Sequence, residues 1–125
     1  MDIIVDSVDA GMTVLDLGAN IGYVSLHVCK QIGANGFLYA IEPEPNNFKV
    51  LKKNIADNNF SERVSLDSLA FSDSNSSVKM YISSHSNMNS IVGSGDNYIE
   101  VPSRTLDSYF QDINRLPIFI KMDIE

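Results

Sequence analysis

Short apolar segments alternate along the chain with segments of helical periodicity. In residues 21–32 and 45–58 the apolar side chains recur every three or four positions, which predicts two helices that each have one apolar face. Short runs that are mostly apolar are typical of strands buried on both faces, and we expect such strands at residues 13–17, 36–41, 64–66 and 118–124.

The part of the chain between the last two of these strands has weaker patterns. Residues 72–75 are a cluster of turn-forming residues, and weak alternation predicts short strands at 78–82 and 98–101. Residues 83–97 are rich in serine, asparagine and glycine, so we expect a long loop there. A short helix is predicted at 106–113, before Pro117. This part is therefore expected to form a hairpin-like insertion.

Strands that alternate with helices indicate an α/β fold with a mostly parallel sheet and right-handed crossovers. The length of 125 residues suits a single domain, and we assign residues 1–125 to it. In such sheets a ligand binds beyond the carboxyl ends of the strands, where the strand order reverses. The residues that follow each predicted strand are therefore the candidates for a functional site.

The first candidate is the turn from Asp16 to Gly22, between the first strand and the first helix. Gly18 and Gly22 allow a tight turn and close packing, and Asn20 lies between them. The helix N-terminus suits a carboxylate, whereas Asp16 can meet an ammonium group. Both groups occur at the methionine end of S-adenosylmethionine. A strand-to-helix turn with two structural glycines is the alternative interpretation.

Other nucleotide-binding patterns fit this turn poorly. The dinucleotide pattern G-x-G-x-x-G fails, because Asn20 and Tyr23 stand where its second and third glycines would be. Glu42 follows the second strand, where a carboxylate can accept hydrogen bonds from both ribose hydroxyls of a nucleoside. After the third strand, Ser68 and Ala70 are candidates for the adenine edge, although an ordinary turn explains them equally well.

The last strand ends in three charged residues on one side: Lys121, Asp123 and Glu125. Charged groups are rarely buried without partners, and the carboxyl end of the strand places these three at the cleft. Asp123 and Glu125 are the candidate catalytic residues: Asp123 could hold the cofactor ammonium or the substrate hydroxyl, and Glu125 could be a base or a metal ligand. A strand that is simply leaving the core is the alternative. His85, in the predicted loop, is a weaker candidate base, and we expect the lysines of the second helix to lie in solvent.

Charge and composition disfavour several classes of partner and site. The formal net charge is −7, which disfavours nucleic acid because phosphate backbones would be repelled. The single cysteine excludes an internal disulfide or a cysteine-based metal cage, and no metal site is predicted. No segment resembles a signal peptide or reaches the roughly 18 apolar residues of a membrane span. We therefore expect a cytoplasmic protein with no membrane partner.

Taken in order, these motifs resemble the FkbM family of class I methyltransferases, whose sheet is Rossmann-like. The matching segments are 14–22, 42–45, Leu51 with 54–55, 70–73, 105–107 and 120–125. The resemblance implies S-adenosylmethionine as the cofactor and O-methylation of a small-molecule acceptor such as a sugar or a polyketide. It implies that Asp16, Gly18 and Gly22 shape the methionine side, that Glu42 takes the ribose, and that Asp123 borders the methyl group.

The resemblance also suggests a sheet truncated after its fourth core strand, with only the cofactor-binding half present. The last strand would then be an open edge, which invites self-association. Two alternatives to an active methyltransferase are a non-catalytic module that binds S-adenosylmethionine and a nicotinamide-dependent oxidoreductase, because one fold hosts many functions.

Overall fold

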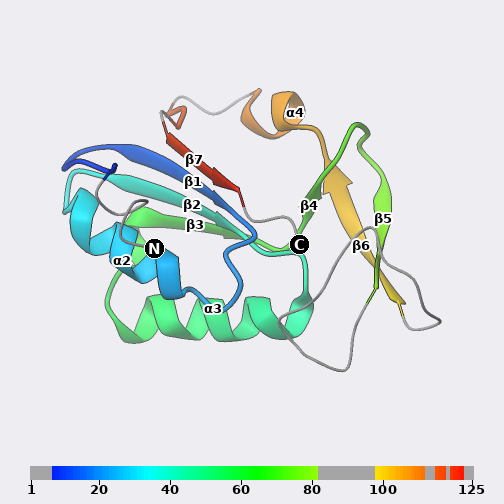
Figure 1. Cartoon of the computed structure of the whole chain (residues 1–125), viewed down its shortest axis with the longest axis horizontal. Helices are drawn as coiled ribbons and strands as arrows, with labels where there is room; N and C mark the ends of the chain where they lie inside the picture. Colours follow the sequence, from blue (N-terminus) through cyan, green and yellow to red (C-terminus); the bar gives the residue numbers. More distant parts are fainter. Residues whose placement is uncertain (1–6, 82–97, 112–114, 118, 123–125) are drawn as a thin grey trace.

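The main sheet of the protein has four parallel strands. The computed structural model describes residues 7–81, 98–111, 115–117 and 119–122. The strands run in the order β3-β2-β1-β7, and every neighbouring pair is parallel (Figure 1). They are β1 (Thr13–Leu17), β2 (Phe37–Ile41), β3 (Val64–Asp67) and β7 (Phe119–Met122). The predicted α/β fold and parallel sheet are confirmed. The strand order reverses at β1, because β2 lies on one side of it and β7 on the other.

Two helices cover one face of this sheet (Figure 1). Helix α2 spans Tyr23–Ile32 and helix α3 spans Pro45–Asp57, and a short 3-10 turn at Ser61–Arg63 leads into β3. Helix α3 begins as predicted, with Pro45 in its first turn. The carboxylate of Glu44 caps it by accepting from the backbone N–H groups of Asn46 and Asn47. The lysines of α3 are exposed, as predicted.

Alternation along β1 and β2 divides the core between the two faces of the sheet. Val14 and Leu38 pack against the side covered by α2 and α3, together with Val28 and Leu51. Leu15 and its neighbours on the opposite face belong to a second cluster that includes the aromatic residues of helix α4. Both faces of the central strands are therefore buried, which explains why most of their residues are apolar.

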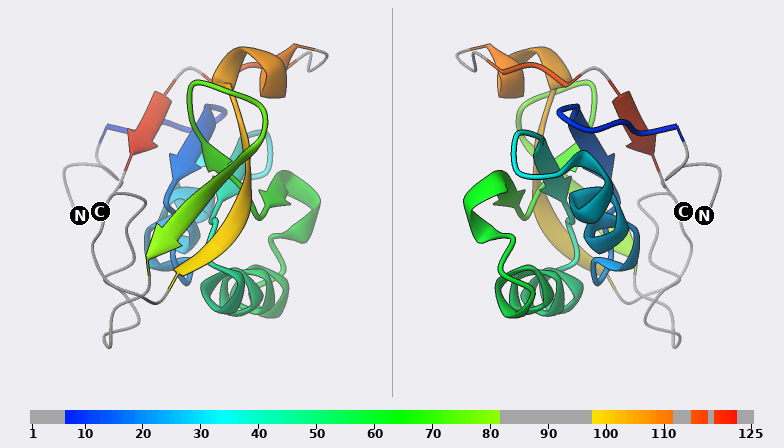
Figure 2. Two further views of the ribbon diagram at one scale, coloured as in Figure 1. Left: turned by 90° about the vertical axis from the view of Figure 1, so that its right-hand side faces the viewer. Right: turned by 90° about the vertical axis from the view of Figure 1, so that its left-hand side faces the viewer.

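A second, three-stranded sheet lies beyond the main one (Figure 2). Its order is β4-β6-β5, formed by β4 (Ala70–Phe71), β6 (Tyr98–Arg104) and β5 (Ser77–Tyr81), and helix α4 (Leu106–Phe110) follows it. The antiparallel pairing of β5 with β6 confirms the predicted hairpin. Strand β4, which runs parallel to β6, was not predicted, because two residues are too short to give a pattern.

Two side chains connect these parts of the molecule. The hydroxyl of Tyr109 on α4 donates a short hydrogen bond to the carboxylate of Asp67 at the end of β3. In the segment before β7, Arg115 Nε donates to Thr13 Oγ1 at 2.7 Å, and its backbone carbonyl accepts from the Tyr39 hydroxyl at 2.8 Å. These contacts fix the approach to β7. In the part of the chain that the structure describes, no helix is long and apolar enough to cross a membrane.

Candidate cofactor site

The turn between β1 and α2 has an unusual backbone. Gly18, Asn20 and Gly22 have φ angles of 73°, 58° and 100°, all in the left-handed region. This conformation strains residues that have a Cβ atom, although asparagine tolerates it better than most. The prediction that Gly18 and Gly22 permit a tight turn therefore agrees with the backbone. Helix α2 has no side-chain hydrogen bond at its N-cap, Gly22, and the first N–H groups of a helix have no acceptor within the helix.

Glu42 lies directly against this turn. Its Oε1 atom accepts from the backbone N–H of Asn20 at 2.7 Å, and its Oε2 atom accepts from the backbone N–H of Glu44 at 3.0 Å. Glu42 is buried, with 5% of the residue exposed. Burial raises the pKa of the Glu42 carboxyl above its ordinary value, while the two N–H bonds oppose that shift. Each oxygen has a further lone pair, so the carboxylate retains capacity to accept from a ligand.

Asp16 is held in a buried polar cluster rather than in an open cleft. It is fully buried, its Oδ2 accepts from the Ser25 hydroxyl at 2.7 Å, and its Oδ1 lies 3.0 Å from Lys121 Nζ. Lys121 Nζ also lies 3.3 Å from the Gly18 carbonyl oxygen, to which it donates. Lys121 is the register partner of Asp16 across the β1–β7 pair. The sequence singled out Lys121 as a charge near the cleft but did not indicate this pairing.

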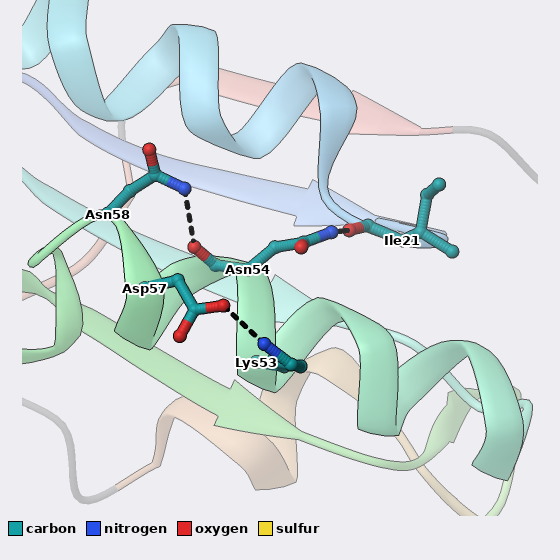
Figure 3. A network of polar contacts seen from close by, with 5 residues as sticks. All are labelled: Ile21, Lys53, Asn54, Asp57 and Asn58. Carbon is teal, nitrogen blue, oxygen red and sulfur yellow. Dashed lines mark hydrogen bonds and ion pairs between the residues drawn. The ribbon is translucent and has the colours of Figure 1, made fainter.

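Helix α3 packs closely against the other end of the turn (Figure 3). The Asn54 side-chain amide donates to the Ile21 carbonyl oxygen at 2.7 Å. A Cβ atom placed on Gly22 would meet the Leu51 Cδ1 atom at 3.0 Å. The glycine is therefore required both by its φ angle and by the nearness of α3.

The remaining predicted residues fall in three groups. Ser68 is half-buried, directly after the end of β3. Ala70 is buried and pairs with Ser103 in the β4–β6 ladder. The roles of both at an adenine edge stay predictions. Asp123, Glu125 and His85 lie outside the described residues. The chain leaves β7 at Met122, whose register partner is Leu17, the residue just before the turn.

The site therefore brings together the segments that the sequence singled out separately. The turn after β1 and the carboxylate after β2 are in hydrogen-bond contact, at the carboxyl end of the sheet and beside the point where strand order reverses. A helix N-terminus offers N–H donors to an anion, and Glu42 offers acceptors to hydroxyl groups. This arrangement suits a ligand that carries a carboxylate at one end and a ribose further along.

Comparisons with known proteins give a family match and similar folds. Residues 16–125 match the family described as the methyltransferase FkbM domain. A SAM-dependent O-methyltransferase from Thermotoga maritima has a TM-score of 0.52 at 20% identity, covering 59% of this chain and 30% of that one. A SAM-dependent methyltransferase from Aquifex aeolicus has a TM-score of 0.50 at 22% identity, covering 60% and 39%. A protein-L-isoaspartate O-methyltransferase has a TM-score of 0.46 at 24% identity, covering 53% and 20%. No curated protein matches the sequence.

The likeness to the Thermotoga maritima and Aquifex aeolicus proteins shows a shared fold. The chain is similar to parts of these proteins, because it spans between 20% and 39% of their lengths.

Proposed function

The chain belongs to the methyltransferase FkbM domain family, and from this premise we propose that it binds S-adenosylmethionine and transfers its methyl group to a hydroxyl of a small molecule. The observation that carries the proposal is the 2.7 Å hydrogen bond from the Asn20 N–H to Glu42. It joins the two segments that would contact opposite ends of the cofactor.

The residues fit this cofactor at both ends. Glu42 would accept the ribose hydroxyls through the free lone pairs of its two oxygens, while Asn20 and Glu44 hold it in place. The first turn of α2 would bind the amino-acid carboxylate. Asp16 would support the turn indirectly, by holding Lys121, because its own oxygens face Ser25 and Lys121. A direct contact between Asp16 and the ligand ammonium would require Lys121 to move.

Catalysis would come mostly from positioning. When bound, S-adenosylmethionine would supply a methyl group on a sulfonium centre, whose carbon accepts a bond from the hydroxyl oxygen in line with the breaking bond to sulfur, so that S-adenosylhomocysteine leaves. Asp123 and Glu125, which follow β7 in the sequence, are the proposed groups that help to remove the hydroxyl proton. The net charge of −7 supports an uncharged small acceptor over a nucleic acid.

Calorimetric titration of the purified chain with S-adenosylhomocysteine, the demethylated product, tests cofactor binding. We expect saturable binding, and NAD⁺ should bind more weakly. In competition experiments with the unmodified protein, 2′,3′-dideoxyadenosine should bind about tenfold or more weakly than adenosine, because it lacks both donors to Glu42. Glu42→Gln should weaken binding, whereas Glu62→Gln, at an exposed position, is the matched control. A folded chain that binds no S-adenosylhomocysteine at millimolar concentration would refute the proposal.

A second assay separates catalysis from binding. The chain is incubated with methyl-labelled S-adenosylmethionine and either a panel of polyhydroxylated small molecules or RNA. We expect label in the small molecules, and less of it with Asp123→Asn or Glu125→Gln. Binding without transfer to any acceptor would contradict the catalytic part of the proposal and favour a non-catalytic binding module.

A further inference from the structure

The turn between β1 and α2 depends on contacts from other elements for its shape. Three of its residues, Gly18, Asn20 and Gly22, have left-handed φ angles. Its internal backbone hydrogen bond runs from the Gly22 N–H to the Ala19 carbonyl at 3.0 Å. Because such a backbone is strained at a residue with a side chain, the surrounding structure must hold it in place.

The first part of the turn is fixed from the sheet. The Ile41 carbonyl accepts from the N–H groups of Gly18 and Ala19 at 2.9 and 3.0 Å. Glu42 accepts from the Asn20 N–H, and Lys121 donates to the Gly18 carbonyl. These contacts come from β2, from the residue after it and from β7. They act on the turn up to its middle residue.

The last part of the turn is fixed from helix α3. The Asn54 Nδ2 atom donates to the Ile21 carbonyl at 2.7 Å, as Figure 3 shows. The carbonyl belongs to the peptide bond that leads into Gly22, and helix α2 begins at the next residue, Tyr23. Rotation of that peptide would displace the Gly22 N–H from the Ala19 carbonyl and change the φ angle of Gly22, the residue that precedes α2. Asn54 therefore lies where it can hold the backbone at the start of α2, although the hydrogen bond itself is exposed.

We propose that Asn54 is a positioning residue for the carboxylate end of the ligand, because it holds the peptide from which α2 begins. This inference rests on the proposed function. It assigns Asn54 to the amino-acid end of S-adenosylmethionine, whereas Glu42 would serve the ribose. Loss of Asn54 should therefore weaken ligands that carry the amino-acid group and spare ligands that lack it.

Helix α3 provides a matched control for Asn54. The Asn58 amide also donates to a backbone carbonyl, that of Asn54, at 2.8 Å (Figure 3). Asn58→Asp and Asn54→Asp each remove one such donor and add one negative charge near the end of α3. Only Asn54→Asp removes a contact with the turn. Asn54→Leu and Asn58→Leu make the same comparison without adding a charge.

The test compares two ligands by calorimetry with each variant of the chain. S-adenosylhomocysteine carries the amino-acid group, and 5′-methylthioadenosine lacks it. We expect Asn54→Asp and Asn54→Leu to bind S-adenosylhomocysteine about five- to tenfold more weakly than the unmodified chain, which is the effect of one lost hydrogen bond. Binding of 5′-methylthioadenosine should change less than about twofold, and the Asn58 variants should change neither affinity by more than that.

Amide hydrogen exchange gives an independent readout. Exchange at residues 21–25 should be faster in the Asn54 variants than in the Asn58 variants. If the unmodified chain binds S-adenosylhomocysteine but the Asn54 and Asn58 variants bind it equally well, the inference about Asn54 is wrong while the proposed function stands. Equal weakening of both ligands by Asn54→Leu would also overturn it, because that result indicates a general structural defect.

Discussion

Removal of Lys121 tests how strongly the stability of the protein depends on the buried ion pair between Lys121 and Asp16. In Lys121→Met the Asp16 carboxylate loses the ammonium group that lies 3.0 Å away. Two unit charges at that separation attract by about 5 kcal/mol at an effective dielectric constant of roughly 20. Their side chains are 10% and 0% exposed, so solvent screens the pair weakly. We therefore expect a loss of about 3–5 kcal/mol in the free energy of unfolding, as for other buried pairs broken on one side.

The surface pair of Lys53 and Asp57 is the comparison. Its atoms are closer, at 2.6 Å, but its side chains are 73% and 58% exposed. Lys53→Met should cost about 0.5 kcal/mol or less, because water screens exposed pairs and holding the side chains costs entropy. Lys121→Met should therefore lose more stability than Lys53→Met, because burial matters more here than the distance between the charges.

Urea denaturation followed by circular dichroism measures both losses. The double variant Asp16→Asn with Lys121→Met should recover much of the stability lost in Lys121→Met, because no buried charge is then left without its partner. It also provides a folded protein if the single variant fails to fold. A loss below about 1 kcal/mol for Lys121→Met, or a double variant less stable than the single one, would refute this account of the site.

Three further predictions concern individual residues. Gly22→Ala should lower the free energy of unfolding by about 1–2 kcal/mol in urea denaturation, because alanine is strained at a φ of 100° and its Cβ meets Leu51; no loss would contradict the geometry of the turn. Burial raises the pKa of the Tyr109 hydroxyl above its ordinary 10.0, and the hydrogen bond to Asp67 adds to the shift. As the pH rises, the unfolded chain therefore releases this proton before the folded one. The free energy of unfolding should fall above pH 10, and it should fall less steeply in Tyr109→Phe. Parallel pH profiles of the two proteins would argue against the hydrogen bond. Burial raises the pKa of the Cys29 thiol from 9.0 to about 11, so its reaction with a disulfide reagent at pH 8 should be about a hundredfold slower than in the urea-unfolded chain. Equal reaction rates in the folded and the unfolded chain would show that the thiol is accessible in the folded protein.

The order of the elements, and the positions of most of them, could be predicted from the pattern of residues along the chain. The mostly apolar runs of β1 and β2 indicated strands buried on both faces, and both strands are buried in this way. Gly18, Gly22 and Glu42 were identifiable as well, because the turn after a parallel strand places them at the same end of the sheet. These features depend on residues close together in the chain.

The residues that stabilise that end of the sheet became identifiable only from the packing of the folded chain. The pairings of Asp16 with Lys121 and of Asp67 with Tyr109 join residues far apart in the chain. Asn54 is one of several polar residues on α3, and nothing in its local sequence indicates that it contacts the turn. A pattern along the chain records which face of an element is apolar, but it does not record which side chain of another element meets a given carbonyl. That depends on how helices and strands pack, which is a property of the whole fold.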